Sequence, residues 1–129
     1  MSSNNSTAQS CKVVILGESG VGKTCIINRY INNTFNPESM TTSGASYASK
    51  TMFFEQYEKN LKFDIWDTAG QEKFRSLTKI FYKETSVAVL VYDITRKDSF
   101  EEVKKYWYHQ IKDHSPKNTS KSFNLKLFI

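Results

Sequence analysis

The stretch Gly17-Glu18-Ser19-Gly20-Val21-Gly22-Lys23-Thr24, or GESGVGKT, decides the fold of this chain. It fits the pattern G-x-x-x-x-G-K-[ST], which is typical of a loop that binds phosphate groups. The glycines allow the backbone to wrap so that successive N–H groups point at phosphate oxygens. Lys23 supplies a positive charge for the outer phosphates, and the hydroxyl of Thr24 is suited to bind Mg²⁺. We call residues 17–24 the phosphate loop.

The residues on both sides of the phosphate loop support this interpretation. The apolar run 13–16 precedes it and is typical of a buried parallel strand. After the loop, apolar residues recur at helical spacing, at Ile26, Ile27, Tyr30 and Ile31. The alternative is a glycine-rich turn between two core elements, but chance matches to the pattern are expected at only about a few in 100,000 positions. A strand, a loop and a helix in this order predict a phosphate site whose attraction the helix dipole increases.

Length and composition limit the classes of protein to which this chain could belong. The 129 residues suffice for one domain, and 39% hydrophobic with 24% charged residues predicts an ordinary soluble globular protein. No apolar run is long enough to span a bilayer, and no charged-then-apolar signal peptide opens the chain. The two cysteines, at 11 and 25, show no metal or redox spacing, so we expect a reduced, cytoplasmic protein.

The net charge of +5 comes mostly from lysines after residue 60, which are spread along a predicted helix and the residues that follow it. A solvated helix face is the favoured interpretation, and a weak attraction to acidic membranes or partners is the alternative. No basic stripe interleaved with aromatic residues occurs, so nucleic acid is not an expected partner.

The chain order predicts one domain behind a short tail. Residues 1–10 are small and polar and predict a disordered tail, and residues 11–129 are expected to form the domain. A first strand is expected over 11–17, followed by a helix that ends near residue 33. The polar stretch that follows, TFNPESMTTSGAS, has the length of a functional loop.

The second half predicts more strands and one more helix. Residues 47–57 and 61–66 are expected to form an antiparallel hairpin joined by Glu58-Lys59-Asn60. The apolar run 86–93 predicts a central parallel strand. Asp98 is the expected N-cap of the next helix, with Glu101 completing a capping box. Its buried stripe is expected to be Phe100, Val103, Trp107 and Ile111, and Pro116 is expected to close it. Alternation over 123–129 predicts an edge strand.

The hairpin's second strand ends in a second candidate for the site. Asp67 closes the segment Phe63-Asp64-Ile65-Trp66-Asp67 and is followed by Thr68-Ala69-Gly70-Gln71. In a protein with a phosphate loop, a carboxylate at the end of a neighbouring strand is where Mg²⁺ would be organised. Many strands end in Asp, so the residues that follow Asp67 carry this interpretation.

WDTAGQE together with GESGVGKT resembles the Ras superfamily of small GTPases. Leu90-Val91-Tyr92-Asp93-Ile94-Thr95, Lys62 to Trp66 and Lys73 to Thr78 resemble signature segments of its Rab branch. The resemblance runs from about Cys11 to Asn118. It implies an α/β, P-loop NTPase fold: a doubly wound, mostly parallel sheet with an antiparallel edge hairpin. It also implies a switch that binds GTP or GDP with Mg²⁺, hydrolyses GTP and regulates vesicle traffic.

The resemblance assigns roles residue by residue. Lys23 matches the phosphate lysine, and Thr24, Thr42 and Asp67 match the residues that hold Mg²⁺. Gly70 matches the sensor of the γ-phosphate, Gln71 the residue that orients the attacking water, and Phe35 the aromatic that lies against guanine. The remaining nucleotide-binding positions are Ser19, Gly20, Val21, Gly22 and Cys25. Without the resemblance, Gln71 in a polar loop would be read as a solvated side chain.

The resemblance also implies partners. Exchange factors, GTPase-activating proteins and effectors would bind the switch loops, Thr34-Tyr47 and Thr68-Glu84. Tyr47, Trp66 and Phe81 fall where Rab proteins place an aromatic triad that effectors contact. Two of the three are exchanged between Phe and Tyr relative to the usual pattern, and Ser43 replaces an Ile, so the resemblance does not extend to partner choice. For Trp66 and Phe81 the alternative is ordinary core packing.

The family pattern continues with motifs that residues 119–129 do not contain. These are Asn-Lys-x-Asp and Ser-Ala-Lys for the base, a last strand and helix, and a C-terminal Cys for prenylation. The sequence therefore predicts an incomplete domain with weak nucleotide binding, contacting membranes only indirectly. A full-length, prenylated form would be peripheral at endomembranes. The alternative is a non-catalytic interaction module that does not load guanine nucleotide productively. A truncated product, alternative processing and an incomplete gene model all stay open.

Overall fold

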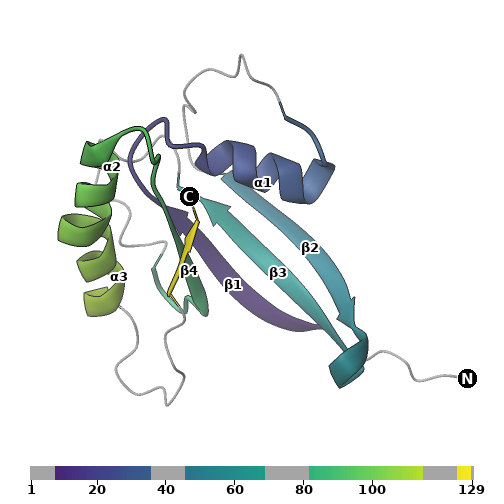
Figure 1. The fold of residues 1–129 in the computed structure, drawn as a ribbon. Helices are drawn as coiled ribbons and strands as arrows, with labels where there is room; N and C mark the ends of the chain where they lie inside the picture. Colours follow the sequence, from purple (N-terminus) through teal and green to yellow (C-terminus); the bar gives the residue numbers. More distant parts are fainter. Residues whose placement is uncertain (1–7, 36–45, 69–81, 115–124, 129) are drawn as a thin grey trace, which may run out of the picture.

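The computed structural model describes residues 8–35, 46–68, 82–114 and 125–128 (Figure 1). These residues build a five-stranded sheet in the order β2-β3-β1-β4-β5. The strands are β1 (Gln9–Leu16), β2 (Ser46–Phe54), β3 (Lys59–Asp67), β4 (Val87–Val91) and β5 (Leu125–Phe128). Only β2 and β3 pair antiparallel, and the other neighbours run parallel. The predicted mostly parallel sheet, its antiparallel edge hairpin and the edge strand near residue 125 are confirmed.

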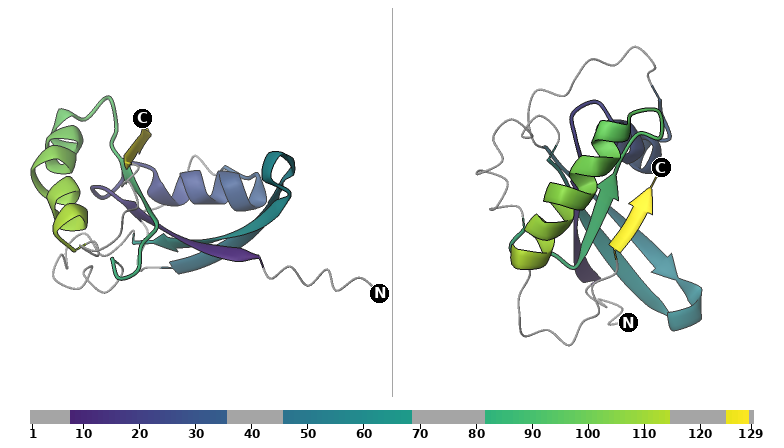
Figure 2. Two further views of the ribbon diagram at one scale, coloured as in Figure 1. Left: turned by 90° about the horizontal axis from the view of Figure 1, so that it is seen from below. Right: turned by 60° about the vertical axis from the view of Figure 1, so that its left-hand side comes forward.

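Helices cover both faces of the sheet (Figure 2). Helix α1 (Lys23–Asn32) lies on one face, where its Ile27 packs among buried residues from the strands, Val13, Ile15, Ile65, Val89 and Val91. The other face carries a helical run made of α2 (Lys97–Glu102), a π-helical turn (Val103–Trp107) and α3 (Tyr108–His114). Its core consists of Val14, Leu16, Tyr82, Ala88, Leu90, Val103, Trp107 and Ile111. Because odd and even strand residues go to opposite faces, β1 and β4 are buried on both sides.

The π-helical turn keeps the second helical run facing the sheet. Ser99, Val103, Trp107 and Ile111 follow one another every four residues, and all four are buried. In an α-helix, residues four apart drift by about 40° per step around the axis, because each residue advances about 100°. A π turn holds more residues per turn, so it reverses part of that drift. Three members of the predicted stripe are therefore buried, while Phe100 is half-buried against Tyr92.

Several predicted boundaries are wrong by a few residues. Strand β1 begins at Gln9, two residues before the expected start. The hairpin turn is not at 58–60, because a 3₁₀ turn (Glu55–Tyr57) and Glu58 in the left-handed region, at φ 48°, reverse the chain earlier. Within the described residues, no helix is long and apolar enough to cross a membrane.

The predicted capping box is also wrong. Helix α2 starts at Lys97 after Arg96, and its N-cap makes no side-chain hydrogen bond. Ser99 takes over the local hydrogen bonding instead. Its hydroxyl donates to the Arg96 carbonyl at 2.7 Å and accepts from the Asp93 N–H at 3.0 Å. The Asp93 carboxylate in turn accepts from the N–H and the hydroxyl of Thr95, and the pKa of Asp93 is lowered chiefly by that hydroxyl.

Candidate functional site: the phosphate loop and its surroundings

The phosphate loop leaves the sheet at a point where only glycine fits. Gly17 follows β1 at φ 151°, and a Cβ there would lie 2.3 Å from the carbonyl oxygen of Val91. A distance this short cannot be tolerated between a side chain and backbone. Gly20 and Gly22 also have positive φ, at 79° and 103°, a conformation that side-chain-bearing residues rarely adopt. These three glycines let the loop turn tightly from β1 into α1.

Lys23, the first residue of α1, closes the loop from inside. Its side chain is 3% exposed, and Nζ donates hydrogen bonds to the carbonyls of Gly17 and Glu18, each at 2.7 Å. Two carbonyl acceptors compensate part of the loss of hydration of a buried ammonium group. The sequence-predicted phosphate lysine is therefore placed within the loop, at the start of a helix of ten residues.

Thr24 and Asp67 meet beside the loop. The Thr24 hydroxyl donates to a carboxylate oxygen of Asp67 at 2.7 Å, although the two residues are 43 positions apart. Asp67 is 2% exposed at the end of β3, where it pairs in register with Ile15 of β1. The next residue, Thr68, fixes this strand end by donating its hydroxyl to the Ile15 carbonyl at 2.6 Å. The parallel register of β1 and β3 thus brings two predicted metal ligands together.

The oxygen atoms of Thr24 and Asp67 fit Mg²⁺. Mg²⁺ prefers hard oxygen ligands and is usually held by one or two carboxylates plus phosphate oxygens and water. In the described part of the chain, no group of three or more His, Cys, Asp or Glu side chains could hold a metal ion without such help. A site of one hydroxyl and one carboxylate beside a phosphate loop suits a cation that arrives with a phosphate ligand.

Two side chains hold the outside of the loop: Arg96, just before α2, and Trp107, at the end of the π-helical turn. The guanidinium of Arg96 donates from Nη1 to the Ser19 carbonyl at 2.8 Å. The indole N–H of Trp107 donates to the Glu18 carboxylate at 2.9 Å. Sequence reasoning placed Trp107 in the core and gave Arg96 no role. No local signal marks either contact, because the partners are 77 and 89 residues apart.

Comparison with known proteins decides the family. The Ras family model matches residues 12–124. The chain belongs to the Ras family. It is 44% identical over 108 residues to the Ras-related protein Rab-22A of Homo sapiens, covering 83% of this chain and 54% of that protein. It is 43% identical over 107 residues to the Ras-related protein RABA2d of Arabidopsis thaliana, covering 83% of this chain and 48% of that protein. Its relatives place it among the Rab-type small GTPases, and it spans about half of their length.

The remaining nucleotide-binding positions of this Ras-family chain are only partly described. Cys25 is half-buried in the first turn of α1, and Val21 packs against the core on the α1 side. Phe35 is 57% exposed and lines an open pocket of about 720 Å³ with Cys25, Ile26, Arg29, Tyr30, Asn33 and Lys50. Thr42, Gly70 and Gln71 lie outside the described residues. The resemblance-based roles of these three residues stay predictions.

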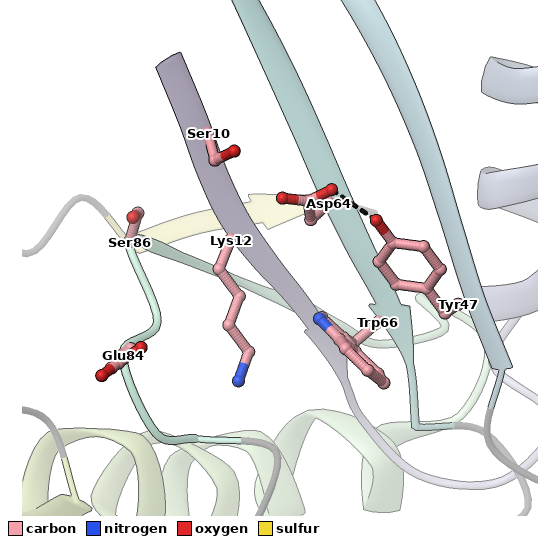
Figure 3. Close-up of a pocket in the computed structure, with 7 residues that line it drawn as sticks. All are labelled: Ser10, Lys12, Tyr47, Asp64, Trp66, Glu84 and Ser86. Carbon is pink, nitrogen blue, oxygen red and sulfur yellow. Dashed lines mark hydrogen bonds between the residues drawn. The ribbon is translucent and has the colours of Figure 1, made fainter. Parts of the chain in front are cut away.

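Two of the three residues expected in the Rab aromatic triad pack together. The rings of Tyr47 and Trp66 lie 4.9 Å apart, and the Tyr47 hydroxyl donates to Asp64 at 2.5 Å. They line a pocket of about 480 Å³ with Ser10, Lys12, Asp64, Glu84 and Ser86 (Figure 3). Phe81, the third expected member, lies outside the described residues. Trp66 is half-buried, so it is neither pure core nor fully exposed.

Lys12 adds a positive charge to this pocket. Its ammonium lies 5.6 Å from the centre of the Trp66 ring and donates to the Lys83 carbonyl at 2.6 Å. Burial lowers the pKa of Lys12, and the nearby carboxylate of Glu84 opposes part of that shift. Both signs of charge therefore border the two aromatic rings.

Proposed function

We propose that this chain binds GTP and GDP together with Mg²⁺ and acts as a Rab-type molecular switch that hydrolyses GTP. The observation that carries the proposal is the hydrogen bond between Thr24 and Asp67 beside the phosphate loop. It joins two oxygen ligands suited to Mg²⁺ at the place where a nucleotide's outer phosphates would lie. A loop that served only as a glycine-rich turn would not require this pair.

Each residue has a stated task in the proposal. Lys23 and the backbone N–H groups of 19–25 bind the phosphates, and Mg²⁺ neutralises charge on the phosphate oxygens. Thr24, Thr42 and Asp67 hold the cation, directly or through water. Gln71 orients the attacking water, Gly70 contacts the γ-phosphate through its N–H, and Phe35 lies against the base. Loss of the γ-phosphate releases Thr42 and Gly70, which makes the switch.

The proposal extends to partners and location by family membership. Exchange factors, GTPase-activating proteins and effectors bind the segments 34–47 and 68–84. The first segment ends with Tyr47, and Trp66 lies just before the second. Such a switch regulates intracellular vesicle and membrane traffic. It is located in the cytoplasm and at the surface of endomembranes. The mixed polar and aromatic pocket around Tyr47 and Trp66 supports a protein partner on this surface.

The test is equilibrium binding of a fluorescent guanine nucleotide with Mg²⁺ to the wild-type chain and to Lys23→Ala. We expect Lys23→Ala to remove binding, because it takes away the only side-chain ammonium that the loop encloses among the described residues. The control is Lys105→Ala, which changes an exposed lysine of the π-helical turn. This variant should bind the nucleotide normally. A second arm uses Gln71→Leu, which should slow single-turnover hydrolysis and leave affinity nearly intact. Unchanged binding by Lys23→Ala would remove the phosphate loop as the site. Absence of binding by the wild type would favour the non-catalytic interaction module.

A further inference from the structure

The two contacts on the outside of the phosphate loop form a brace, defined by Arg96 with Ser19 and Trp107 with Glu18. Both residues sit on one continuous segment: Arg96 directly precedes α2, and Trp107 ends the π-helical turn. Both reach consecutive residues of the loop. The segment that covers one face of the sheet therefore also holds the loop that would bind phosphate.

The Arg96 contact fixes the direction of a backbone N–H. In a planar trans peptide, the carbonyl of one residue and the N–H of the next point in opposite directions. The guanidinium holds the Ser19 carbonyl on the outer side of the loop, at 2.8 Å. The N–H of Gly20 is thereby turned to the inner side, where successive N–H groups would bind phosphate oxygens. Asp98, 3.3 Å from the second guanidinium nitrogen, restrains the arginine in its turn.

The Trp107 contact works through Glu18. The indole N–H holds the carboxylate of Glu18, and the backbone carbonyl of the same residue accepts from the Lys23 ammonium. Glu18 is thus held from the outside by its side chain and from the inside by its main chain. Trp107 is 1% exposed and packs in the core, so the anchor point is rigid. A π turn places this indole, and π turns interrupt α-helices frequently at functional sites.

We propose that Arg96 and Trp107 are positioning residues of the phosphate loop, which orient its N–H groups for nucleotide phosphates without touching the nucleotide. The identity of the ligand rests on the proposed function. The geometry of the brace does not depend on it. The proposal predicts that nucleotide affinity depends on hydrogen bonds made by the segment from Arg96 to Trp107, outside the loop. If these two residues served only the fold, substituting them would lower the stability of the whole chain and of the loop together.

The first measurement is equilibrium binding of Mg²⁺-GDP to the full 129-residue chain and its variants. Arg96→Ala should weaken binding roughly tenfold, because a charge-assisted hydrogen bond is lost. Glu18→Ala should weaken it as well, whereas Glu18→Gln, which retains an oxygen acceptor for the indole, should recover most of the affinity. Trp107→Phe keeps an aromatic ring in the core and removes the N–H donor, but it also leaves a cavity at this buried position, so the Glu18 variants carry the test of this contact. Lys105→Ala, exposed on the same segment, is the control.

The second measurement needs no nucleotide. Hydrogen exchange of the ligand-free chain should quicken at residues 18–22 in Arg96→Ala and Glu18→Ala, with exchange in β1 and β4 unchanged. If loop exchange quickens in the two variants while the wild type binds no nucleotide, the brace is upheld and only the proposed function is overturned. Unchanged loop exchange in both variants would overturn the inference, and so would equal affinities of Glu18→Ala and Glu18→Gln. Faster exchange across the whole sheet would show a structural role instead and also overturn it.

Discussion

At the scale of single residues, the site is set by contacts that differ in how far apart their partners lie in the chain. Gly17, Lys23 and Thr24 were predictable, because phosphate chemistry demands those residue types at fixed spacing in one short stretch. Asp67 was predictable only from the residues that follow it. Arg96 and Trp107 were not, since a hydrogen bond between residues 77 or 89 positions apart leaves no pattern in the sequence. The sequence therefore predicted the residues of the motif but not the residues that contact it from outside.

A prediction at this scale concerns Gly17→Ala. The new Cβ would lie 2.3 Å from the Val91 carbonyl oxygen, so β4 or the loop must shift. We expect the free energy of unfolding to fall by roughly 2–4 kcal/mol, within the range of strained or overpacked substitutions. Urea denaturation followed by circular dichroism measures it. Gly22→Ala is the matched control, since it has a positive φ but no atom within 4 Å of the new Cβ. Equal losses in the two variants would contradict the close approach to Val91.

At the scale of elements, local patterns located every strand of the sheet but misplaced some of their ends. The short connection Glu58-Lys59-Asn60 between residues 47–57 and 61–66 predicted a hairpin, yet the chain reverses at Glu55–Tyr57 and Glu58. Turn chemistry points to Asn60, because Asn adopts positive φ more readily than Glu. Pairing of Phe54 with Lys59 places the reversal earlier, because it extends the ladder. The helix start was likewise misplaced, because Ser99 rather than Asp98 makes the side-chain hydrogen bonds to the backbone at this helix start.

The π-helical turn yields a prediction at this scale. Deleting Lys105, which is exposed within Val103–Trp107, should convert the π turn into an α turn while leaving Trp107 and Ile111 near the buried face. We expect the free energy of unfolding to change little, because a π turn accommodates one extra residue within an α-helix. Inserting one Ala after Lys105 should instead rotate the later residues by about 100° and move Trp107 out of the core. That variant should lose roughly 3–5 kcal/mol. Thermal unfolding of both variants is the measurement, and a greater loss from the deletion than from the insertion would contradict this account.

At the scale of the whole molecule, the parallel register explains why distant segments meet at one place. Ile15 pairs with Asp67, and Leu16 pairs with Leu90, so the carboxyl ends of β1, β3 and β4 lie at the same edge of the sheet. In open α/β sheets, ligands bind outside this edge. The phosphate loop follows β1, Asp67 ends β3, and Arg96 lies in the segment that follows β4. All three are therefore at this edge. The resemblance implied a doubly wound, mostly parallel sheet with an edge hairpin, whereas the strand order β2-β3-β1-β4-β5 comes from the structure.

The last prediction links this edge to the stability of the entire chain. A ligand that binds only the folded state stabilises it by about 2.7 kcal/mol at a hundredfold excess over its dissociation constant. Under the proposed function, Mg²⁺-GDP should therefore raise the midpoint of thermal unfolding, and chelation of Mg²⁺ with EDTA should remove most of the gain. Asp67→Asn should reduce the part of the gain that depends on Mg²⁺, because an amide replaces the carboxylate that accepts from Thr24. Without nucleotide, the same variant should unfold close to the wild-type temperature, since the amide keeps an oxygen that can accept from the Thr24 hydroxyl. A Mg²⁺-dependent gain that is as large in Asp67→Asn as in the wild type would show that Asp67 does not hold the cation. A large loss of stability in the nucleotide-free variant would show instead that this carboxylate serves the fold.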